Sequence, residues 1–302
     1  MFALLCTALG LSLAPPQDSV VRLGPTAPAE TLNVTVTGPA TGPTLVIIPG
    51  LISPAYAYRG LLGPLNQAGI RTVVVEPLGV GGSSRPGGKS DYSIWAQAQR
   101  VGAALDSVGI ADAVVMGHAV GATIALRLAV ERPTLARRLV LLEVGSLESA
   151  AVPGVKQALR FSFLVRLFAG RGRIRKELRK GLIGTSVDSS WVTDSLVERY
   201  TAGAAGSMGA VLRALKRMDQ SVEPDSLVQR LPEIRVPVRL VVGGGERLGG
   251  SRSAGKGRLR VLSTGLPQFT VDTIPGAGLH LQEEQPDAVA AALRQEVEEA
   301  YR

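Results

Sequence analysis

The sequence predicts an α/β fold, with a doubly wound, mostly parallel sheet that carries a helical insertion. Short apolar runs rich in β-branched residues alternate with segments of helical periodicity, which is typical of a parallel sheet covered by helices on both faces. The alternation stops after residue 145 and resumes at about residue 231. We therefore expect a core at residues 30–145 and 231–302 and a helical insertion at 146–230.

The expected elements follow from the same pattern in chain order. Each strand is a short apolar run that glycine, proline or a polar residue ends, and each helix repeats apolar residues three and four positions apart. In the first part of the core, strands are expected at 31–38, 44–50, 71–77, 113–118 and 138–144, and helices at 54–67, 91–108 and 120–132. In the second part, strands are expected at 236–243 and 269–274, a helix or loop up to residue 265, and a helix at 286–301.

Composition excludes several classes of protein. The 302 residues include one cysteine, Cys6, and two histidines, so an intramolecular disulfide and the usual zinc ligand sets cannot form. We expect no metal and no organic cofactor. The net charge of +8 suits an anionic surface, but aromatic residues make up only 4% of the chain and no nucleic-acid-binding motif is evident. A nucleic-acid partner is therefore not expected.

The N-terminus predicts export. Residues 1–14 form an apolar run that is too short to span a bilayer and ends in Ser12-Leu13-Ala14 before two prolines. This segment is interpreted as a signal peptide, which predicts a secreted or periplasmic protein. The alternative is an apolar N-terminal tail on a cytoplasmic protein.

A turn with the spacing of a nucleophile elbow follows the expected strand at 113–118. Gly117 and Gly121 lie two residues before and two residues after Ala119, and a helix is expected to follow at once. Glycines at these positions permit a sharp turn that pushes the central side chain above the sheet. The central residue, however, is alanine, where a nucleophile is needed.

Three further motifs accompany the elbow. Residues 49–51 follow an expected strand, 76–86 form a glycine-rich loop that begins with glutamate, and 275–286 hold Pro-Gly-Ala-Gly before Glu-Gln-Pro. Together with the elbow, they resemble the α/β-hydrolase family over nearly all of residues 30–302. The resemblance implies the α/β-hydrolase fold and a site at the elbow.

The resemblance also implies an oxyanion site at Gly50, Leu51 and Val120, where backbone N–H groups face a developing negative charge. The family more often has His-Gly where this chain has Pro49-Gly50. Pro49 thus differs from the family pattern, whereas Gly50 matches it.

The base and the acid each have two candidate positions. His280 lies in the loop that resembles the family's histidine loop, but the family's usual spacing to Pro286 places Leu279 in the base position. His118 belongs to the elbow and is expected to point away from the site. The acid that would orient His280 is Glu246, after the strand at 236–243, or Glu143, at the end of the strand at 138–144.

The first part of the insertion is basic. Residues 156–180 carry nine Lys and Arg side chains against one acid, together with three phenylalanines. By resemblance, the insertion forms a cap whose apolar side chains line a substrate pocket. The alternative is that this segment contacts an anionic membrane surface.

These observations predict a hydrolase of ester-like or other small apolar substrates that Ala119 leaves inactive or strongly impaired, because a methyl group cannot attack a carbonyl. The nucleophile could have been lost naturally or by engineering. The alternative is a non-catalytic protein that binds an apolar or acyl ligand in the same pocket. A third, weaker possibility is non-covalent chemistry with His280 as a general base.

Overall fold

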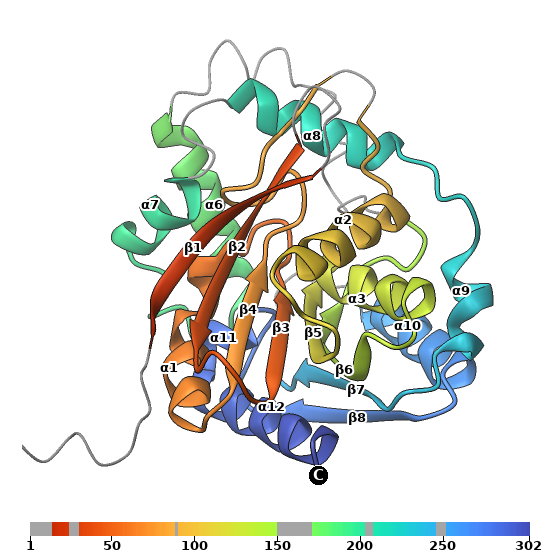
Figure 1. Ribbon diagram of the computed structural model, residues 1–302. Coiled ribbons are helices and arrows are strands. Elements are labelled where there is room, and N and C mark those ends of the chain that lie inside the picture. The colour runs from red at the N-terminus through yellow and green to blue at the C-terminus, as the bar shows by residue number, and fades with distance from the viewer. Residues whose placement is uncertain (1–13, 24–29, 88–89, 150–170, 203–207, 246–251) are drawn as a thin grey trace, which may run out of the picture.

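The computed structural model describes residues 14–23, 30–87, 90–149, 171–202, 208–245 and 252–302. In these residues the chain forms one eight-stranded sheet in the order β1-β2-β4-β3-β5-β6-β7-β8 (Figure 1). β1 and β2 run antiparallel to their neighbours, and the remaining pairs are parallel. The predicted fold class is therefore confirmed. The strands are β1 (Ala14–Leu23), β2 (Glu30–Gly38), β3 (Thr44–Ile48), β4 (Arg71–Val75), β5 (Ala113–Ala119), β6 (Ala136–Val144), β7 (Val238–Gly243) and β8 (Phe269–Ile274).

The sheet begins earlier than predicted. β1 pairs with β2 along most of its length, so the core starts at Ala14 and not at residue 30. The sequence Ala-Pro-Pro-Gln-Asp at its start hides this strand, but an edge strand tolerates proline and charge because one of its sides has no neighbouring strand. Most of the predicted signal peptide, residues 1–13, lies outside the described residues.

Helices cover both faces of the sheet. The helices of the core are η1 (Ala55–Tyr58, a 3-10 helix), α1 (Arg59–Gln67), α2 (Ile94–Ser107), α3 (Val120–Glu131), η2 (Leu231–Glu233, a 3-10 helix), α10 (Arg252–Gly265), α11 (Leu281–Glu284) and α12 (Pro286–Ala300). Alternate side chains of β3 show that both faces are covered, because Leu45 and Ile47 pack in the layer with α1 and α12, whereas Val46 and Ile48 pack in the layer with α2 and α3.

The helical insertion follows β6 and lies over one end of the sheet (Figure 1). Its described helices are α6 (Arg171–Thr185), α7 (Asp194–Ala202), α8 (Met208–Gln220) and α9 (Leu227–Arg230). Residues 150–170, which hold most of the predicted membrane-contacting segment, lie outside the described residues. In the part that the structure describes, no helix is both long enough and apolar enough to cross a membrane.

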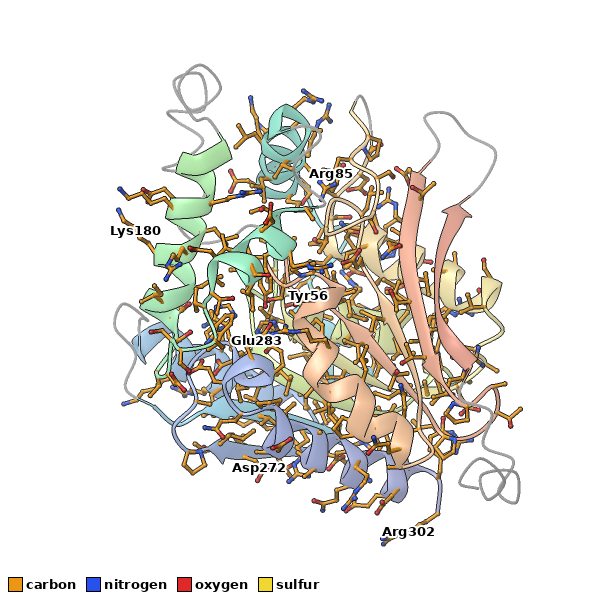
Figure 2. All side chains as sticks on the ribbon, turned by 90° about the vertical axis from the view of Figure 1, so that its left-hand side faces the viewer. Tyr56, Arg85, Lys180, Asp272, Glu283 and Arg302 are labelled. Atoms are coloured by element: carbon orange, nitrogen blue, oxygen red, sulfur yellow. The ribbon has the colours of Figure 1, made fainter. Side chains whose placement is uncertain are left out.

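Ion pairs join the basic helix α6 to its neighbour α7. Arg175 pairs with Glu198 at 2.9 Å, and Arg179 pairs with Asp194. Lys180 projects from the outer side of α6 (Figure 2). Part of the basic charge of this segment is therefore neutralised within the insertion.

The return from the insertion to the core is held by Arg127, a fully buried residue of α3. Its guanidinium pairs with Asp225 and lies 3.8 Å from Glu223. Glu223 in turn accepts the backbone N–H of Ile94 at the start of α2. Since α3 begins directly at the elbow, these contacts connect the insertion to the element that carries the site.

Candidate functional site

The predicted elbow is present between β5 and α3. Ala119 has φ 52° and ψ −113°, a conformation that L-residues rarely adopt and that costs free energy. A Cβ on Gly117 would lie 2.3 Å from the carbonyl oxygen of Gly121, and one on Gly121 would lie 2.1 Å from that of Ile48. Both glycines are therefore required by close backbone approach. The turn retains the geometry that displays a nucleophile, with a methyl group at its apex.

The loop after β3 packs directly on this turn. A Cβ on Gly50 would lie 3.2 Å from the carbonyl oxygen of His118 and 3.5 Å from Cβ of Ala119. The loop bends back on itself through a hydrogen bond from the Ser53 N–H to the Gly50 oxygen, at 3.2 Å. Gly50 thus allows the loop to lie against the elbow.

A cavity of about 250 Å³ lies over the elbow. Its walls combine apolar side chains with groups that can titrate. The structure brings most of the predicted site residues together there: Gly50, Leu51, Ala119, Val120, Glu143, Leu279 and His280 all line it.

His280 is fully buried and held by the insertion. Its Nε2 lies 3.0 Å from Oγ1 of Thr185, the last residue of α6. The same hydroxyl also lies within hydrogen-bond distance of the carbonyl oxygens of Gly181, at 2.8 Å, and Leu182, at 3.2 Å, and the tautomer of His280 sets which partner donates in the Thr185–His280 bond. The ring of Trp191, also in the insertion, lies 5.3 Å from the imidazole. The nitrogen that a hydrolase base needs is therefore bonded to Thr185.

His118 does not point away from the site as expected. It lines the same cavity, and its ring centroid lies 6.2 Å from that of His280. Its Nε2 lies 3.1 Å from the carbonyl oxygen of Leu279 and donates to it, because a carbonyl only accepts. Burial lowers the pKa of His118 to about 4, so the ring is neutral near pH 7.

This buried histidine predicts a pH dependence of stability. The unfolded His118 binds its proton with a pKa near 6.5 and the folded one with a pKa of about 4, so the unfolded state holds more protons between these values. Stability is full above pH 6.5 and falls as the pH drops towards 4, by about 3 kcal/mol in all. Urea unfolding of His118→Asn from pH 7.5 to 4 should show a shallower decline than the parent chain. Equal slopes would contradict the assignment.

One of the two candidate acids is described. Glu143, at the end of β6, is buried, has φ 52°, and accepts the backbone N–H of Gly243 at 2.9 Å. Its carboxylate therefore joins the ends of β6 and β7 on the wall of the cavity. Glu246 lies outside the described residues.

Sequence reasoning assigned no role to Glu76, which organises the loops around the cavity. Its side chain is buried and accepts the backbone N–H groups of Ala55 and Gly82, both at 2.7 Å, and the side-chain amide of Asn33 at 3.1 Å. The contact is so close that a Cβ on Gly81 would fall 1.9 Å from the carboxylate. A glutamate directly after a buried strand and before a glycine-rich run was the available signal.

Two acids fix the loop that carries His280. Glu284 accepts the N–H of Gly278 at 3.0 Å and that of Val187 at 2.7 Å, which ties the loop to the insertion. Glu283 accepts the Tyr200 hydroxyl at 2.8 Å and pairs with Arg59 at 2.7 Å. Figure 2 shows Glu283 near Tyr56, over whose ring Arg59 lies. The position of His280 thus depends on the insertion as well as on the core.

Within the residues that the structure describes, no group of three or more His, Cys, Asp or Glu side chains is arranged to hold a metal ion. The two histidines of the cavity therefore lack a third ligand of these types in the described part of the chain.

Comparisons with known proteins agree with this architecture. A family model described as the alpha/beta hydrolase fold matches residues 43–169. A haloalkane dehalogenase of Mycolicibacterium paratuberculosis is 32% identical over 104 residues, which are 34% of this chain and only 35% of that relative. The magnesium-chelatase 30 kDa subunit of Rhodobacter capsulatus is 28% identical over 213 residues, 70% of this chain and 73% of that one.

A solved structure matches over nearly the whole length. Cfl2 from Burkholderia cenocepacia superimposes with a TM-score of 0.69 at 22% identity and covers 94% of this chain and 99% of its own. This likeness concerns the fold. Together with the family match and the elbow geometry, it shows that the chain has the α/β-hydrolase fold.

Proposed function

We propose that this protein binds a small apolar or acyl-type ligand in the cavity over Ala119 and does not cleave it by the covalent route. The observation that carries the proposal is the methyl group at the apex of a strained elbow. Covalent hydrolysis in this family requires a nucleophile at that atom, next to a base. A methyl group offers neither a lone pair nor a proton to transfer.

A second cavity supports an apolar ligand. It also measures about 250 Å³, shares the wall residues Leu51 and Ile52 with the first, and lies between the core and the insertion. Its walls include Leu178, Tyr200 and Met218 from the insertion helices. Two adjoining apolar chambers suit a ligand with a short polar head and a longer apolar tail. The name of one relative, haloalkane dehalogenase, also denotes a small apolar substrate.

The bond between Thr185 and His280 argues against general-base chemistry. A base must lie within hydrogen-bond reach of the proton that it takes, and its accepting nitrogen must be free. Here Nε2 is already hydrogen-bonded to the Thr185 hydroxyl. The proposal therefore expects no turnover from His280 alone.

A p-nitrophenyl ester series, from short to medium chains, tests the proposal. The parent chain and Ala119→Ser are both expected to show no hydrolysis above the uncatalysed rate, because the first lacks a nucleophile and the second lacks a free base. The matched control is Ala103→Ser, which adds the same hydroxyl on α2. Turnover by the parent chain would overturn the proposal.

A second candidate function is that of a hydrolase that has lost only the nucleophile at residue 119. The intact turn geometry at Gly117 and Gly121 favours it. In that case Ala119→Ser, or Ala119→Ser combined with Thr185→Ala to release His280, hydrolyses the esters. Either result would replace the binding proposal with a hydrolytic one. The acyl-chain length of the ester that reacts fastest would then indicate the size of the two apolar cavities.

A further inference from the structure

Two polar side chains on the wall of the cavity over the elbow have no partner within the described residues. Ser53 is fully buried, and its hydroxyl makes no hydrogen bond there. Arg258, from α10, lines the same cavity, and its buried Nε likewise makes none. A buried donor without a partner costs about 1–3 kcal/mol. Two such donors on one small cavity indicate a ligand that accepts hydrogen bonds.

The charge around these donors favours an anion. A neighbouring cavity of about 340 Å³ shares Glu143 and Arg258 with the first and is also lined by Lys256. Within the described residues, neither Arg258 nor Lys256 forms an ion pair, whereas Glu143 has one carboxylate oxygen bonded to the Gly243 N–H. Arg258 therefore lies on the wall that the two cavities share, Lys256 adds a second cation on the neighbouring cavity, and the one carboxylate on the shared wall, Glu143, is hydrogen-bonded towards β7.

The rest of the cavity is apolar. Most of its lining surface is apolar, and the lining residues include Leu51, Ile52, Val120, Val144 and Leu279. An ion without an apolar part would leave these walls exposed to water, and a neutral apolar molecule would leave Ser53 and Arg258 without partners. A medium-chain carboxylic acid satisfies both requirements.

We propose that the cavity binds the carboxylate of an apolar acid, with Arg258 as counter-ion and the Ser53 hydroxyl as second donor. The apolar chain of the acid then lies along Leu51 and Ile52 towards the chamber under the insertion. This inference rests on the proposed function and deepens it, because it names the chemical class of the ligand and the residues that determine specificity.

Calorimetric titration of the full chain with octanoate and with octanol at pH 7.5 tests the inference. The two probes share the apolar chain and differ in charge. Octanoate is expected to bind at least about tenfold more tightly, as a charge-assisted hydrogen bond warrants. Equal affinity for the two would overturn the inference and leave the proposed function standing. Failure of both to bind would instead overturn the proposed function, and the inference with it.

Single-residue variants identify which side chains cause the preference for octanoate over octanol. Arg258→Gln is expected to lower octanoate affinity about tenfold and leave octanol unchanged, and Arg258→Lys is expected to restore part of the preference. Ser53→Ala should weaken octanoate by a smaller factor. Arg260→Gln removes an exposed arginine of the same helix that does not line either cavity, and it controls for net charge. An equal loss in Arg258→Gln and Arg260→Gln would show a general charge effect and refute the role of Arg258.

Acetate carries the carboxylate without the apolar chain, so its affinity distinguishes a site for any small anion from a site for an apolar acid. If acetate binds as tightly as octanoate, the site is a simple anion site and the proposal is wrong. Affinity that rises along acetate, butanoate, hexanoate and octanoate supports it, since each buried methylene contributes about 0.8 kcal/mol, close to fourfold per methylene.

Discussion

Replacing Gly121 with alanine is expected to destabilise the protein by about 3 kcal/mol or more, although alanine is the better helix former. Gly121 lies in the first turn of α3, where helix propensity alone predicts a gain of about 1 kcal/mol. The added Cβ would lie 2.1 Å from the Ile48 oxygen and 2.7 Å from the Pro49 oxygen. Both contacts are with backbone atoms, so the steric clash can be relieved only if β3 and the elbow move apart. Urea unfolding measures the change.

Gly181→Ala is the matched control. This exposed residue lies in α6, and an added Cβ would meet no heavy atom within 4 Å. Its replacement is expected to stabilise the protein by about 0.5–1 kcal/mol through helix propensity. If Gly121→Ala were as stable as Gly181→Ala, the close approach of the elbow to β3 would be refuted. Octanoate binding should also be lost in Gly121→Ala, since the loop beside the elbow must shift.

Glu76→Ala is expected to cost about 3–5 kcal/mol. The substitution leaves the N–H groups of Ala55 and Gly82 and the amide of Asn33 without their acceptor, and each buried donor without a partner costs about 1–3 kcal/mol. The loops that the carboxylate joins are expected to loosen, so ligand binding should weaken together with stability. Unfolding in urea and octanoate titration measure the two effects.

Two further variants make the Glu76 result specific. Glu76→Gln keeps one carbonyl acceptor and should fall between the parent chain and Glu76→Ala. Glu298→Ala removes an exposed glutamate of α12 whose ion pair with Arg294 spans 3.5 Å, and a change of at most about 0.5 kcal/mol is expected. If Glu76→Ala were as mild as Glu298→Ala, the carboxylate would not be holding the loops.

Local sequence determined much of the fold. The alternation of apolar strands with helices predicted the parallel sheet, because a strand buried on both faces must be apolar along most of its length, as β3 is from Leu45 to Ile48. The glycines at 117 and 121 predicted the elbow, because only glycine fits where backbones approach this closely. β1 escaped prediction because an edge strand needs no continuous apolar run.

The sequence by itself therefore determined the fold class, the elbow and the absence of a nucleophile at its centre. Only the tertiary structure decided how the polar groups of the site pair. The bond of His118 to Leu279 joins residues 161 positions apart, and that of Thr185 to His280 joins residues 95 apart. Backbone conformation depends on neighbours in sequence, whereas a side-chain partner depends on which distant segments the packed core brings together. Tertiary packing therefore decided three features of the site: the direction of His118, the hydrogen bond that constrains His280, and the place of Arg258 on the cavity wall.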